Sequence, residues 1–82
     1  MYSYFAYPDM SYDVYGQIIN SISQNFPELI GQQVFTTDFE TKIYTFSKDG
    51  QRVISILYQK SIELIAVESE IDLDGVMYLI PN

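Results

Sequence analysis

The sequence predicts an α+β fold, with one amphipathic helix packed on an antiparallel β-meander of three to five strands. Apolar residues recur every four positions in an early segment and then alternate with a period of two after about residue 31. From residue 47 onward the predicted elements are joined by short connections, which make antiparallel neighbours. A chain of 82 residues is long enough for one small domain, so we expect residues 1–82 to form a single domain.

The helix is predicted from about Ser11 to Gln24. Its main apolar positions keep a spacing of four, at Val14, Ile18, Ile22 and Phe26. This spacing makes one face of the helix apolar, and we expect that face to dock on a core. Asp9 or Ser11 can cap the start of the helix by accepting hydrogen bonds from its free amides, while Asn25 and Pro27 provide the stop.

Six segments have the alternation or the β-forming composition of strands. They are residues 2–7, Val34–Phe39, Lys42–Ser47, Arg52–Tyr58, Ile62–Val67 and Val76–Ile80. The pattern leaves open whether the second and third are two strands or one long bent strand. Gly50 suits a hairpin turn over residues 47–50, because such turns need a positive φ. Gln59–Ser61 and Asp74–Gly75 are predicted to be further turns.

The residue inventory argues against catalysis. The chain has no histidine and no cysteine, so it lacks the common general base, the thiolate nucleophile and the usual ligands for zinc. Its four glycines lie far apart, and neither a P-loop nor a dinucleotide-binding motif occurs. We therefore expect a protein that is not an enzyme and that uses no cofactor and no metal.

Residues 70–75 resemble the opening of an EF-hand calcium loop, because oxygen ligands alternate and a glycine follows. The bidentate glutamate that such a loop requires would fall at Pro81, and the flanking segments have the pattern of strands. A polar β-turn explains the segment better. The start of the chain has no basic residue before an apolar run, and no long apolar window occurs, so we expect a cytoplasmic protein that binds no membrane.

The net charge of −7 is unevenly distributed. Residues 1–31 and 61–82 contain eight carboxylates and no basic residue, whereas residues 32–60 contain three carboxylates and all four basic residues. A strongly negative field repels nucleic acid and attracts basic surfaces. The expected partner is therefore a protein with a basic surface, and direct binding of nucleic acid is not expected.

Four carboxylates occupy alternate positions near the end of the chain: Glu68, Glu70, Asp72 and Asp74. In an extended chain they would share one face at a spacing of about 6.6 Å, which is of the order of the spacing of backbone phosphates. Such a row could imitate a nucleic-acid strand towards a basic groove. The alternative is a solvated face that keeps an edge strand from pairing with other chains.

Two further groups are candidates for partner contact. Asp9 and Asp13 form a second acidic patch in the sequence. Tyrosines crowd the first fifteen residues, and tyrosine is enriched at binding hot spots. Two or three of the five are expected to be exposed, and we predict that Tyr12 and Tyr15 contact a partner.

The leading hypothesis is an acidic, DNA-mimic-like inhibitor that occludes the basic site of a nuclease, a glycosylase or a CRISPR effector. In size and acidity the chain resembles the small acidic inhibitors encoded by phages and mobile elements. An immunity protein or antitoxin that neutralises a toxin is an alternative, because its acidic surface would bind a basic toxin in the same way. A structural, self-assembling subunit is an alternative of a different kind, because the first and last strands could each offer an open edge to a second copy. A homodimer is compatible with each hypothesis.

Overall fold

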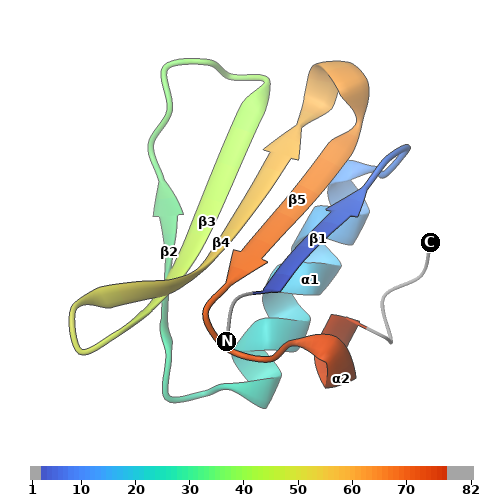
Figure 1. The fold of residues 1–82 in the computed structure, drawn as a ribbon. Helices are drawn as coiled ribbons and strands as arrows, with labels where there is room; N and C mark the ends of the chain where they lie inside the picture. Colours follow the sequence, from blue (N-terminus) through green and yellow to red (C-terminus); the bar gives the residue numbers. More distant parts are fainter. Residues whose placement is uncertain (1–2, 78–82) are drawn as a thin grey trace.

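A computed structural model describes residues 3–77 and confirms the predicted α+β architecture (Figure 1). Within these residues an antiparallel five-stranded sheet has the order β1-β5-β4-β3-β2. The strands are β1 (Ser3–Tyr7), β2 (Ile30–Val34), β3 (Thr41–Lys48), β4 (Gln51–Gln59) and β5 (Leu64–Ser69). The helices are α1 (Tyr12–Asn25), the short 3₁₀ helix η1 (Lys60–Ile62) and α2 (Asp74–Met77).

Helix α1 lies across one face of the sheet and forms the core with it (Figure 1). Its buried residues Tyr15, Ile18 and Ile22 keep the helical spacing that the sequence predicted. They belong to one buried cluster with residues of the central strands, including Phe46, Ile54, Ile56, Tyr58, Ile65 and Val67. Ser11 is the N-cap in an extended conformation, although its side chain makes no capping hydrogen bond.

The predicted hairpin between β3 and β4 is confirmed. Asp49 and Gly50 both have positive φ values, 53° and 79°, as expected for a two-residue hairpin loop that follows the twist of the strands. The register shifts between Phe46 and Ser47, where the ladder of β3 and β4 contains an irregularity. Such irregularities increase the local twist, and here the irregularity precedes the end of the hairpin.

The predicted strand Val34–Phe39 is wrong beyond its first residue, since β2 covers Ile30–Val34. Residues 35–40 form a loop that side-chain hydrogen bonds hold in place. The Asp38 carboxylate accepts a hydrogen bond from the Glu40 amide at 2.9 Å and another from the Thr41 hydroxyl at 3.0 Å. Such local bonds compete with strand pairing, which is why aspartate favours turns.

The C-terminal part also differs from the prediction. Strand β5 ends at Ser69, whose hydroxyl accepts from the Ile71 amide and donates to the Ile71 carbonyl. The Asp72 carboxylate accepts from the Asp74 amide, and α2 begins there. The predicted turn at Asp74–Gly75 and the start of the predicted strand Val76–Ile80 are therefore replaced by a helix, which buries Val76 and Met77. Residues 78–80 of that strand lie outside the described residues.

The face of the sheet opposite α1, here called the open face, carries an apolar strip. The strand registers align one residue from each strand across the whole sheet: Ala6, Ala66, Leu57, Ile43 and Val34. Residues in register share a face, so these side chains form one continuous row. A neighbouring row is mostly polar and consists of Tyr4, Glu68, Ser55, Thr45 and Gln32. No helix in residues 3–77 has the length and apolarity needed to cross a membrane.

Candidate functional site

The fold places seven of the eight carboxylates of the base-free segments on or beside β1, α1, β5 and α2, whereas the eighth, Glu28, lies two residues before β2 at the opposite edge of the sheet. Strands β1 and β5 are neighbours at one side of the sheet, and α1 and α2 contact each other (Figure 1). All eight side chains are exposed, and the seven on this side are here called the acidic flank: Asp9, Asp13, Glu63, Glu68, Glu70, Asp72 and Asp74. All four basic residues lie on or beside β3 and β4. The uneven charge of the sequence thus becomes an uneven charge in space.

The acidic flank has two ends, one at each end of β5. The Met10 amide donates to the Glu63 carbonyl at 2.8 Å, which brings the connection before α1 against the start of β5. Asp9 and Asp13 flank this contact in the sequence. Glu70 follows the other end of β5, roughly 20 Å away at ~3.3 Å per residue. The two acidic patches that the sequence predicted are therefore separate in space.

The extended row of carboxylates is not present, and this premise of the prediction is corrected. Glu68 lies in β5, but the Asp72 carboxylate accepts a hydrogen bond from the Asp74 amide after the strand has ended. Asp74 is the first residue of α2. The regular spacing that would imitate phosphates therefore ends with the strand. Partner binding by these four residues stays a prediction, now based on a curved acidic surface instead of a straight row.

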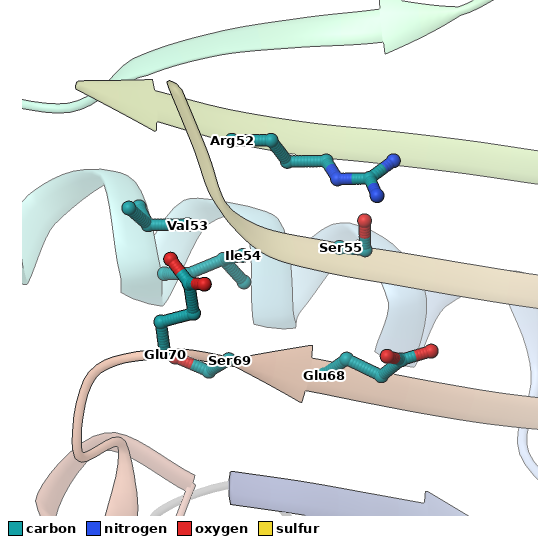
Figure 2. Close-up of a pocket in the computed structure, with 7 residues that line it drawn as sticks. All are labelled: Arg52, Val53, Ile54, Ser55, Glu68, Ser69 and Glu70. Carbon is teal, nitrogen blue, oxygen red and sulfur yellow. The ribbon is translucent and has the colours of Figure 1, made fainter. Parts of the chain in front are cut away.

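Glu68 and Glu70 line a shallow hollow where β4 and β5 separate (Figure 2). Its volume is about 140 Å³, and its other lining residues are Arg52, Val53, Ile54, Ser55 and Ser69. The hollow lies beside the last contacts between the two strands, where the Glu70 amide donates to the Val53 carbonyl at 2.8 Å. It forms because the chain turns away from the sheet directly after Ser69.

The chemistry of this hollow suits a cation from a partner. The side chains of Glu68, in β5, and of Glu70, directly after β5, extend in different directions, so they border the hollow from two sides (Figure 2). A lysine or arginine side chain that enters it would meet carboxylate oxygens, which form charge-assisted hydrogen bonds. Arg52 also lines the hollow, so the local charge is less negative than that of the acidic flank as a whole.

The structure separates the two tyrosines that the sequence predicted as partner contacts. Tyr12 is 56% exposed, whereas Tyr15 is only 1% exposed and belongs to the core. Tyr15 therefore has almost no exposed surface with which to contact a partner, because α1 turns this side chain towards the sheet. Both rings pack with Tyr58 in a cluster whose centroids lie 5.6–5.7 Å apart. Tyr4 is exposed as well, at 57%.

A second hollow, of about 260 Å³, was missed by the sequence analysis. It is lined by Tyr12, Phe39, Glu40, Lys42, Tyr58 and Lys60. Two of the four basic residues therefore stand beside aromatic rings, which would suit an apolar group that carries a negative charge. The hairpin signal alone would place Lys42 opposite Leu57, and the register shift between Phe46 and Ser47 moves Lys42 opposite Tyr58. No local sequence pattern indicates that Tyr12 of α1 and Phe39 of the 35–40 loop would line the same hollow.

Carboxylates are the main potential metal ligands in a chain without histidine or cysteine. In the described part of the chain, no group of three or more of them is placed to hold a metal ion. Comparisons with protein families, with curated proteins and with solved structures find no match for this chain.

Proposed function

We propose that this protein is a non-enzymatic acidic binding protein whose acidic flank covers a basic surface of a partner protein. The observation that carries this proposal is the concentration of seven exposed carboxylates on the β1–β5 side, while the four basic residues lie on or beside β3 and β4. A surface of one sign attracts a partner of opposite sign and speeds its encounter. The hollow between Glu68 and Glu70 would receive a basic side chain of that partner.

The proposed partner is a nucleic-acid-processing enzyme, and the mechanism is occlusion of its basic groove. Proteins that hold nucleic acid do so largely with lysine and arginine on phosphates. The two ends of the acidic flank are roughly 20 Å apart, at ~3.3 Å per residue of β5. This span fits contacts along an extended groove better than contacts with a single pocket. An immunity protein against a basic toxin would use the same surface.

Two double variants with equal net charge test the site. In the first, Glu70→Gln and Asp74→Asn remove two carboxylates of the acidic flank. In the second, Glu40→Gln and Asp49→Asn remove two carboxylates on the other half. Asp38 and Asp72 stay unchanged, because their carboxylates hold local hydrogen bonds and their loss would disturb the fold.

The measurement is capture of host proteins by the immobilised chain at about 0.1 M salt, where the Debye length is ~10 Å, and at about 1 M, where it is ~3 Å. We expect the wild type and the second variant to capture a basic nucleic-acid enzyme at low salt only, and the first variant to lose it. The captured enzyme should be inhibited in competition with its nucleic acid. Equal retention by both variants would show that the acidic flank is not the contact surface.

A further inference from the structure

Strand β2 forms one edge of the sheet without any of the usual protection of an edge strand. All five of its residues are exposed, and it pairs only with β3 within the described residues. Every second residue of an edge strand directs its N–H and C=O outward, ready to pair with another strand. Natural edges are normally blocked by charges, proline or bulges. The sequence Ile30–Val34 contains no charged residue and no proline, and its register with β3 is regular.

The segment around β2 is also apolar and neutral in a strongly acidic chain. No charged residue occurs from 29 to 37, between Glu28 and Asp38. Ile30 is 70% exposed and Phe35 is 88% exposed. Ile30 and Val34 lie on the open face, two positions on either side of Gln32. An uncharged edge with exposed apolar side chains is expected to pair with another strand.

We propose that two copies of this protein dimerise by pairing β2 with β2. An antiparallel pairing around a two-fold axis at Gln32 places Ile30 opposite Val34 of the second copy. Gln32 then stands opposite itself, and the two sheets become one continuous sheet. The apolar strip of the open face, which ends at Val34, continues into Ile30 of the second copy. Residues 30–34 of each copy thus form both sides of the interface.

The charge distribution favours a second copy as the occupant. The acidic flank lies on the β1–β5 side of the sheet, and β2 is the outermost strand on the opposite side, where Glu28 and Asp38 flank the uncharged segment but lie outside the five paired residues. At ~4.8 Å between strands, β2 and β5 are about 14 Å apart, so the β5 strands of a dimer are more than about 30 Å apart. This exceeds the Debye length of ~8 Å at physiological ionic strength. Contact through the acidic flank would instead bring like charges together.

The test uses the fact that residue 32 faces itself in this dimer. Gln32→Glu and Gln32→Lys each place like charges in opposition at the centre of the interface, which destabilises strand pairing. Mixing the two variants places opposite charges there. Gln17→Glu makes the same glutamine-to-glutamate change at an exposed position of α1, outside the proposed interface, and is the matched control. The mass of each sample is measured by sedimentation equilibrium over a range of concentrations, and its fold is checked by circular dichroism.

We expect the wild type and the Gln17→Glu control to form a dimer with equal affinity. Each Gln32 variant alone should keep its fold but dissociate with a dissociation constant raised about tenfold or more, and the mixture should recover a dimer. A wild type that stays monomeric throughout would overturn the proposal, as would a dimer that neither Gln32 variant weakens. The inference is independent of the acidic flank, whose double variant should dimerise like the wild type.

Discussion

The hydroxyl of Tyr44 lies over Gly31, 2.6 Å from where a Cβ on residue 31 would be. Ring carbons of Tyr44 and Phe46 would lie at 2.9 and 3.0 Å from the same Cβ. The two rings pack with their centroids 5.2 Å apart, and Phe46 is directly opposite Gly31 in the β2–β3 register. The glycine therefore leaves room for two aromatic rings that cover the helix-side face of β2.

We predict that Gly31→Ala destabilises the protein. The new methyl group would overlap the Tyr44 hydroxyl and crowd a buried ring of β3, so the rings or β2 must move. Forced repacking of this kind typically costs about 1–3 kcal/mol of unfolding free energy. Urea denaturation measures the change, and a stability equal to that of the wild type would contradict the close packing over Gly31.

Gly16→Ala is predicted to do the opposite. Gly16 lies inside α1, and a Cβ there would meet no atom within 4 Å. Alanine is favoured over glycine in a helix by about 0.5–1 kcal/mol. The same denaturation experiment should show a gain of this order. A loss would mean that the surroundings of α1 are more crowded than the structure shows.

The sequence predicted the fold where local signals and tertiary contacts agree. The spacing of Ile18 and Ile22 identified α1, and the Asp49–Gly50 signal identified the central hairpin. It failed around residues 35–40 and 70–77, where backbone-directed bonds from Asp38, Ser69 and Asp72 stop strands that apolar alternation alone would continue. Alternation reports which side chains could be buried, and it does not report where the chain turns away from the sheet.

The hydroxyl of Tyr15 is a buried polar group whose removal should stabilise the protein. Its hydroxyl is buried without a hydrogen-bond partner of good geometry in residues 3–77. Contact with the Gln33 side chain lowers the pKa of Tyr15, but the Gln33 amide nitrogen donates to the Ile43 carbonyl at 3.1 Å. We expect Tyr15→Phe to raise the unfolding free energy by about 1 kcal/mol, because an unpaired buried hydroxyl is costly. A clear loss of stability in denaturation would show that the hydroxyl is bonded.

Burial of the Tyr15 hydroxyl should also make the stability of the protein depend on pH in the alkaline range. Desolvation by burial raises the pKa of Tyr15 from 10.0 to about 12. The folded state holds the hydroxyl proton more tightly than the unfolded state does. The resulting contribution to the free energy of unfolding is therefore complete below pH 10 and is lost as pH rises through about 12. Denaturation between pH 9 and 12 should show a steeper fall for the wild type than for Tyr15→Phe. Parallel curves would argue against a raised pKa.

The candidate site was predictable in composition but not in shape. The sequence alone shows that residues 1–31 and 61–82 contain eight carboxylates and no basic residue. That these segments become neighbours depends on β1 pairing with β5, a contact between the two ends of the chain that no local pattern predicts. Tyr12 and Tyr15 show the same limit, since both suit a helix and only packing decides which one is buried.

The acidic flank should also make the stability of the protein depend on salt. Seven exposed carboxylates on one side of a small domain repel one another, and salt screens this repulsion. Raising ionic strength from about 0.01 M to 0.15 M shortens the Debye length from ~30 Å to ~8 Å, so Tm at fixed protein concentration should rise.

The Glu70→Gln and Asp74→Asn double variant should start with a higher Tm at low salt and gain less from added salt. The Glu40→Gln and Asp49→Asn variant has the same net charge but removes carboxylates near basic residues, so its gain from salt should be at least that of the wild type. Equal salt responses in all three proteins would mean that the carboxylates act only through the net charge, without a local concentration of repulsion on the β1–β5 side.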